Sequence, residues 1–263
     1  MAKKTLPSTI EYTDLLHDEF SATELKTPRV DENYRYIRDA SLWGKIKRFF
    51  LFFCIAKPMG KIYLKTKFHH EIVGRWKLKR YRHNAIILYG NHTQDIGDAI
   101  IPAFFANRYI NTIVHPNNLV SPVVGKHVPL LGGIPLPNSP KAKPNFDAAL
   151  ERKIKKQQAI IIYPEAHIWP YCTFIRPFPS DSFTYPLYYG SPVFCFVNTY
   201  HRTKKEGKVR IRTYIDGPFF PNPKLSAKEA REELRNEVYN QMCERAALSD
   251  IQVIQYVKKG EKK

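Results

Sequence analysis

One short segment, residues 84 to 101, places the strongest constraint on what this chain can fold into. Residues 85 to 89 form an apolar run bounded by turn-forming residues, which is the pattern of a short buried strand. A glycine and an asparagine then interrupt the strand, and His92, Asp95 and Asp98 follow. In an α/β fold the chemistry usually lies at the carboxyl end of a strand. A histidine beside a carboxylate is also the smallest general-base pair.

A second segment has the same organisation later in the chain. Residues 159 to 167 read Ala-Ile-Ile-Ile-Tyr-Pro-Glu-Ala-His, a buried strand that ends in a turn carrying Glu165. Two more runs rich in β-formers lie at 191 to 199 and 209 to 215, and a capping box at Ser226 opens a long helix. Strands that alternate with helices predict an α/β fold, which we expect to be a single-domain mixed, mostly parallel sheet flanked by helices.

These two segments resemble the motifs of the glycerophospholipid (PlsC-like) acyltransferase family. That family carries Asn-His followed by an aspartate, and later Phe-Pro-Glu-Gly-Thr at the end of a strand. The resemblance extends from about residue 72 to about residue 193. It implies transfer of an acyl chain from acyl-CoA or acyl-carrier protein to a lysophospholipid hydroxyl, with 1-acylglycerol-3-phosphate as acceptor and phosphatidic acid as product. We expect no cofactor, and no acyl-enzyme, because no serine or cysteine stands in a nucleophile elbow.

The resemblance also implies a role for each residue of the two motifs. His92 would deprotonate the acceptor hydroxyl with Asp98 behind the imidazole, and Glu165 would help to hold the acceptor. The family places four residues between histidine and aspartate, whereas here five precede Asp98 and two precede Asp95. We prefer Asp98 because it directly precedes an apolar helical run, and Asp95 stays open as the alternative partner. Two further residues of this turn are assigned to the substrate site, namely Asn91 and Thr93.

The residues that would bind an acceptor phosphate depart from the family pattern. The arginine that follows the family's Pro-Glu-Gly motif is absent, and Asn138 stands where the family often has another arginine. Arginines are suited to that role because they bind phosphate through two parallel hydrogen bonds. We expect Lys141, Lys143 or Arg176 to substitute for them, with Gly133 also at the substrate site. The departure leaves open a related acyltransferase with a non-phosphate acceptor.

The formal charge of +18 is distributed unevenly along the chain. Residues 41 to 82 hold twelve basic residues and one acid. The apolar run from 49 to 56 is too short to span a bilayer, which takes about twenty residues, and lysines flank it. We therefore expect residues 41 to 67 to form an amphipathic segment docked on an anionic membrane at its cytoplasmic face, as a peripheral or monotopic protein. A non-catalytic basic lipid- or nucleic-acid-binding protein is the alternative, although no recognised nucleic-acid motif occurs and no nucleic acid is expected as a partner.

The chain accordingly divides into three parts. Residues 1 to 40 form a polar N-terminal arm, in which we expect one short helix near residues 12 to 20. Residues 41 to 67 are the docking segment, and residues 68 to 263 are the acyltransferase domain. The four cysteines are widely spaced and the histidines show no metal-ligand spacing, which indicates neither a disulfide framework nor a metal site.

Overall fold

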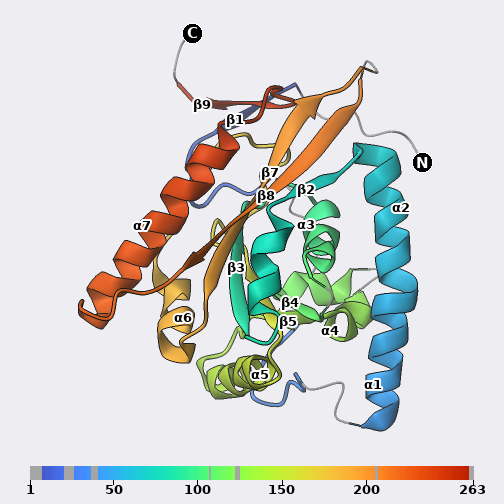
Figure 1. Ribbon diagram of the computed structural model, residues 1–263, viewed down its shortest axis with the longest axis vertical. Coiled ribbons are helices and arrows are strands. Elements are labelled where there is room, and N and C mark those ends of the chain that lie inside the picture. The colour runs from blue at the N-terminus through green and yellow to red at the C-terminus, as the bar shows by residue number, and fades with distance from the viewer. Residues whose placement is uncertain are drawn as a thin grey trace.

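A seven-stranded sheet forms the centre of the computed structural model (Figure 1), which describes residues 8–20, 27–36, 41–106, 108–121, 125–204 and 207–260. In spatial order its strands are β2 (Glu71–Val73), β8 (Val209–Phe219), β7 (Val193–Arg202), β3 (Ile86–Gly90), β6 (Ala159–Ile162), β4 (Ile110–Val114) and β5 (Gly133–Pro135). Neighbouring strands are parallel, except that β7 and β8 form an antiparallel hairpin. The predicted mixed, mostly parallel sheet is confirmed.

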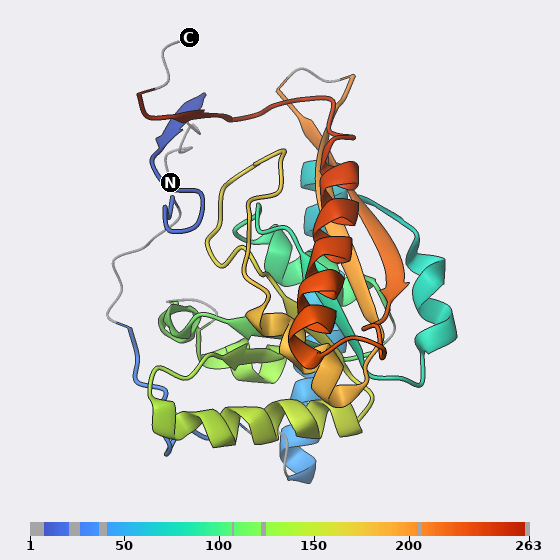
Figure 2. The same cartoon turned by 90° about the vertical axis from the view of Figure 1, so that its left-hand side faces the viewer.

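Helices cover both faces of this sheet (Figures 1 and 2). One face carries α5 (Lys143–Lys155), α6 (Thr184–Tyr189) and α7 (Ala227–Ala246). The other carries α1 (Leu42–Phe49), the π-helix η1 (Phe50–Ala56), α2 (Lys57–Phe68), α3 (Gly97–Ile100) and the 3-10 helices η2 (Arg75–Tyr81) and η3 (Ile101–Phe104). Shorter helices in the connections are η4 (Pro116–Val120), η5 (Gly125–His127), α4 (Val128–Leu131), η6 (Pro140–Ala142) and η7 (Asp181–Phe183).

The two-sided cover explains the apolar run that precedes His92. Ile87 and Tyr89 of β3 belong to the core under α5 and α7, whereas Ile86 and Leu88 belong to the core under α2 and α3. Successive side chains of a strand point to opposite faces, so a strand that is covered on both sides is apolar throughout. The sequence there consequently shows no alternation.

The N-terminal arm differs from the prediction. In place of the expected helix near residues 12 to 20, β1 (Thr9–Tyr12) pairs in parallel with β9 (Gln255–Lys258), and turns follow. The carboxylate of Asp14 accepts a hydrogen bond from the backbone nitrogen of Leu16 at 2.7 Å. Such local bonds from an aspartate compete with helix formation. Parts of the arm, residues 1–7, 21–26 and 37–40, lie outside the described residues.

In the helix from residue 42 to residue 68, one row of buried residues faces the sheet. A change of helical type in the middle of the helix keeps that row aligned. Its buried residues recur at steps of four or eight, at Gly44, Arg48, Phe52, Gly60, Leu64 and Phe68. In an α-helix such a row drifts by about 40° at every fourth residue, because four residues turn through about 400°. The π-helical stretch η1 has more residues per turn, so the drift there runs the other way. The π-helix thus holds the row on the sheet.

The opposite side of the same helix is apolar and exposed. We call it the outer apolar face, and it consists of Leu42, Trp43, Ile46, Phe49, Phe50, Ile55, Met59 and Ile62. In the parts of the chain that the structure describes, no helix has the length and apolar character needed to cross a membrane.

Two nearby phenylalanines of this helix should respond differently to the same substitution. Phe52→Ser should lower the free energy of unfolding by about 3 to 5 kcal/mol, because Phe52 is 5% exposed and its ring lies in the core. Phe50→Ser should change it by less than about 0.5 kcal/mol, because Phe50 is 57% exposed. Urea denaturation measures both values. Equal losses of stability would contradict the structure, in which Phe52 faces the core and Phe50 faces outward.

Candidate active site

The turn after β3 places His92 at the carboxyl end of the middle strand of the sheet. Gly90 ends the strand, and a Cβ atom there would lie 2.1 Å from the ring of Phe196, so a larger residue would displace the ring. The Asn91 side chain then extends the pairing with β7. Its Nδ2 donates to the carbonyl of Asn198 at 3.0 Å, and its Oδ1 accepts from the nitrogen of Asn198 at 2.8 Å. The side chain of Asn91 therefore fixes the turn, and its assignment to the substrate site stays a prediction.

His92 and Asp98 form a hydrogen-bonded pair. Nδ1 of His92 lies 2.8 Å from Oδ2 of Asp98. The same oxygen accepts from the backbone nitrogens of Thr93 at 2.8 Å and Gln94 at 2.9 Å. Asp95 is exposed in the turn before α3. That turn accommodates the one residue by which the spacing from His92 to Asp98 exceeds the family pattern. The structure thus brings Asp98, rather than Asp95, against the imidazole.

Asp98 is a buried carboxylate surrounded by hydrogen-bond donors. It is 2% exposed, and burial raises the pKa of its carboxyl group, while the hydrogen bonds from His92 and the backbone oppose that shift. Its second oxygen, Oδ1, accepts from Nδ2 of Asn198 at 3.0 Å. Both oxygens are thus held, so the carboxylate keeps a fixed orientation beneath the imidazole.

The imidazole of His92 is anchored on one side and partly open on the other. The ring of Tyr163 stacks on it, with centroids 4.4 Å apart, and the Tyr163 hydroxyl donates to the carbonyl of Asp98 at 2.6 Å. Among the described residues, none is hydrogen-bonded to Nε2, and the side chain is 19% exposed. When Nδ1–H of His92 donates its hydrogen bond to Asp98, the neutral ring keeps a lone pair on Nε2. Nε2 is therefore available to take a proton from a bound hydroxyl.

Glu165 braces the turn instead of facing the solvent. Its Oε2 accepts from the backbone nitrogen of His92 at 2.9 Å, and its Oε1 accepts from that of Arg176 at 2.8 Å. Burial raises the pKa of Glu165, and the Arg176 guanidinium, 3.5 Å from Oε2, opposes the shift. Arg176 is 1% exposed and lies 4.8 Å over the ring of Trp169. Both side chains form hydrogen bonds and an ion pair within the protein, and their role in holding the acceptor stays a prediction.

The other predicted substrate residues lie apart from His92 or inside the protein. Thr93 is buried, and its hydroxyl accepts from the hydroxyl of Tyr200 at 2.7 Å. Gly133 begins β5, which β6 and β4 separate from β3, and Lys141 and Lys143 follow β5 in the chain. Lys143 forms an exposed ion pair of 2.6 Å with Asp147. The structure does not bring these two lysines and Gly133 together with His92, and their role in acceptor binding stays a prediction.

Sequence reasoning missed Tyr163 and Asn198, whose side chains contact the side chains of the His92–Asp98 pair. Tyr163 belongs to the Tyr-Pro-Glu motif, but its stacking on the imidazole depends on tertiary structure. Asn198 lies in the buried strand β7. A polar residue in such a strand could have been recognised in the sequence as part of a hydrogen-bonded site, because buried polar groups are nearly always hydrogen-bonded. Within the described part of the chain, no cluster of three or more histidines, cysteines or acidic residues is arranged to hold a metal ion.

Comparisons with known proteins identify the fold. No family model matches this sequence, and a search of curated proteins gave no match. Among solved structures, the chain is similar to the 1-acyl-sn-glycerophosphate (LPA) acyltransferase PlsC from Thermotoga maritima, with a TM-score of 0.52 and 17% sequence identity. The similarity covers 78% of this chain and 84% of that one. At this level of identity it establishes a shared fold.

The bracing role of Glu165 can be separated from substrate binding by its effect on stability. Glu165→Gln should lower the free energy of unfolding by about 3 kcal/mol or more, because the buried guanidinium of Arg176 then lacks its counter-ion. Glu237→Gln, on the exposed side of α7, serves as the control and should have little effect. Chemical denaturation compares the two variants. Unchanged stability of Glu165→Gln would contradict the bracing role.

Proposed function

We propose that this protein is an acyltransferase that moves an acyl chain from acyl-CoA or acyl-carrier protein to the hydroxyl of a lysophospholipid. The observation that carries the proposal is the His92–Asp98 pair at the carboxyl end of the middle strand, with Nε2 partly exposed. The fold shared with the PlsC LPA acyltransferase supports it by analogy, whereas the geometry of the site carries the argument.

The proposed reaction is a direct transfer between the two substrates. Nε2 of His92 removes the proton of the acceptor hydroxyl while its oxygen attacks the thioester carbonyl carbon. The Asp98 carboxylate stabilises the imidazolium that forms, and it does not itself take the proton. The tetrahedral intermediate then collapses, the carbon–sulfur bond breaks, and the departing thiolate receives the proton from Nε2. The products are the ester and the free thiol, and His92 is again neutral.

We propose 1-acylglycerol-3-phosphate as the acceptor. One observation favours a second candidate, an acyltransferase with a non-phosphate acceptor. Asn138, at the position where the resembled family often has an arginine, is hydrogen-bonded to the N-terminal arm. Its Oδ1 accepts from the nitrogen of Val30 and its Nδ2 donates to the carbonyl of Pro28, both at 2.9 Å. This position therefore contributes no cation to an acceptor phosphate.

We also propose that the outer apolar face docks on an anionic membrane surface, at the cytoplasmic side. Several lysines flank this face and are exposed, namely Lys45, Lys47, Lys61, Lys65 and Lys67. Arg48 does not belong to this group, because it is buried, donates to Oδ1 of Asn111 at 2.9 Å and stacks over Tyr109. An outer apolar face flanked by lysines is typical of an interfacial helix. Such a helix gains binding free energy both from apolar burial and from attraction to anionic headgroups.

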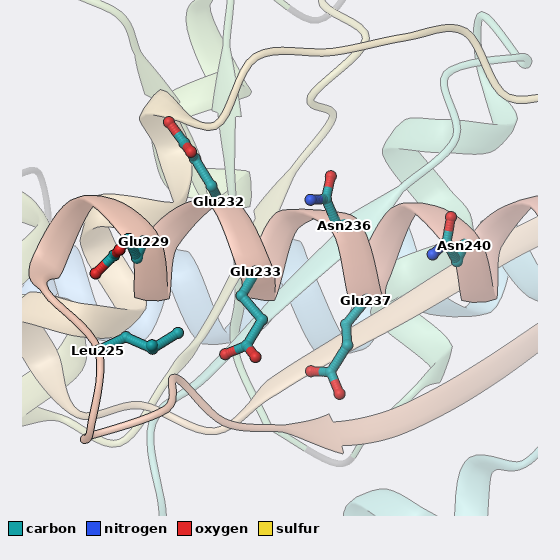
Figure 3. Close-up of a pocket in the computed structure, with 7 residues that line it drawn as sticks. All are labelled: Leu225, Glu229, Glu232, Glu233, Asn236, Glu237 and Asn240. Atoms are coloured by element: carbon teal, nitrogen blue, oxygen red, sulfur yellow. The ribbon is translucent and has the colours of Figure 1, made fainter.

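The charge on the opposite side of the molecule supports this orientation. The outer side of α7 carries a shallow groove lined by carboxylates, including Glu229, Glu233 and Glu237 (Figure 3). The helix from residue 42 to residue 68 and α7 lie on opposite sides of the sheet (Figures 1 and 2). An anionic surface attracts the lysine-flanked helix and repels the acidic side of α7. The same charges would therefore orient the protein as well as bind it.

Substitutions in the pair test the proposed chemistry. His92→Ala should reduce acyl transfer by at least about a hundredfold, the usual effect of losing a general base. Asp98→Asn should also be severe, because asparagine can favour the wrong histidine tautomer. Asp95→Asn is the control and should be mild, since Asp95 is exposed in the turn. Radiolabelled acyl transfer to a panel of lysolipids measures all three variants and also distinguishes phosphate from non-phosphate acceptors. Near-normal activity of His92→Ala would rule out the mechanism.

Vesicle binding tests the docking proposal. Replacing Trp43, Phe49 and Phe50 with serine should release the protein from vesicles of phosphatidylcholine and phosphatidylserine while leaving the melting temperature nearly unchanged, because all three side chains are exposed. Phe220→Ser is the matched control, an exposed ring elsewhere on the surface. Wild-type binding should weaken in salt, because each basic residue near the surface contributes about 1 kcal/mol electrostatically. Equal binding of the triple variant and the wild type would exclude this face as the docking site.

A further inference from the structure

Behind the His92–Asp98 pair, a row of hydrogen bonds crosses the sheet toward its edge. Asn198 of β7 donates from Nδ2 to Oδ1 of Asp98 at 3.0 Å. Its own Oδ1 accepts from the hydroxyl of Thr213 on β8 at 2.7 Å. The Thr213 oxygen in turn lies 2.8 Å from Nε2 of His70, directly before β2. Asn198 and Thr213 are partners in the β7–β8 pairing, so the hairpin itself sets this contact.

Each hydrogen bond of the row can point in only one direction. The Thr213 hydroxyl donates its one hydrogen to Oδ1 of Asn198, so its oxygen accepts a hydrogen bond from Nε2–H of His70. Burial lowers the pKa of His70 to about 4, so the ring is neutral near pH 7 and carries its proton on Nε2. A reversed Asn198 amide would place its oxygen against the Asp98 carboxylate. The Asp98 carboxylate therefore selects the end of the amide that faces it, and the Thr213 hydroxyl holds the other end in place.

We propose that His70, Thr213 and Asn198 are positioning residues that hold Asp98 in register with Nδ1 of His92. The proposal rests on the proposed acyl transfer for its kinetic consequence, but the contacts themselves do not depend on it. The row of hydrogen bonds begins at the end of the long helix. His69 caps that helix in the left-handed conformation, and the backbone nitrogen of His70 donates to the carbonyl of Leu64 at 3.2 Å. The end of the proposed docking helix thus supplies the first donor of the row.

The next residue pair on the same hairpin provides a matched control. Thr199 of β7 is fully buried, as Thr213 is, and its hydroxyl oxygen also lies 2.8 Å from Nε2 of a histidine, His201. Nδ1 of that histidine lies 3.0 Å from Asp250, after α7, rather than leading toward His92. Thr199→Val and Thr213→Val therefore remove similar buried contacts, and only the second interrupts the row behind Asp98.

The experiment compares Thr213→Val, Thr213→Ser and Thr199→Val in the full-length protein. Thr213→Val should lower kcat about tenfold with KM nearly unchanged, a loss of about 1.4 kcal/mol, which is typical of one hydrogen bond. It should also shift the proton resonance of Nδ1–H of His92 and reduce that tautomer in nitrogen NMR spectra. Thr213→Ser, which keeps the hydroxyl, should restore both. Thr199→Val should change neither, although its melting temperature should fall by a similar amount.

The NMR readout separates this proposal from the proposed function. If the wild-type protein transfers no acyl chain while Thr213→Val alone shifts the His92 resonance, the acyltransferase proposal fails and the positioning row stands. If the two valine variants leave the His92 resonance unchanged, or shift it equally, the row does not position the pair, whatever the activity. Equal losses of kcat in the two variants would overturn it as well.

Discussion

The burial of the Asp98 carboxylate is the constraint on which the rest of the site depends. Removing a charged group from water is costly unless donors in the protein replace the water. The donors to Asp98 come from the turn after β3, from the imidazole of His92 and from Asn198 on β7. Stabilising one carboxylate therefore requires the turn, the imidazole and a neighbouring strand to meet at one point. The geometry of the His92–Asp98 pair follows from that requirement.

The turn is also held from the side away from Asp98. Glu165 binds the nitrogen of His92, and the loop after β6 donates from Trp169 to the carbonyl of His92 at 3.0 Å. Glu165 is itself neutralised by Arg176, so the loop carries its own buried ion pair. Two acids of the sequence motifs thus have different tasks. Asp98 orients the imidazole, whereas Glu165 fixes the backbone that carries it.

The sequence allowed the local elements to be predicted better than the partners of individual side chains. The uninterrupted apolar run before His92 identified a strand covered on both faces, and the capping box at Ser226 is present with both of its hydrogen bonds. The inward orientation of Glu165 depends on Arg176, eleven residues further on, and spacing alone does not reveal such a partner. The same holds for Arg48, whose partner Asn111 is brought near only by the folded sheet.

The position of β2 has a consequence for the order in which the protein assembles during synthesis. Among the strands that the structure describes, β2 lies at the sheet edge and pairs with β8 alone, through Glu71–Val73 and Arg212–Tyr214. The long helix leaves the ribosome before β8 has been made, and at about 5 to 20 residues per second the interval is many seconds. During that interval β2 has no partner strand, although β3, β4, β5, β6 and β7 have already been made. The edge strand that follows the long helix is therefore the first of the seven strands to be synthesised, but it gains its partner last, when β8 is made.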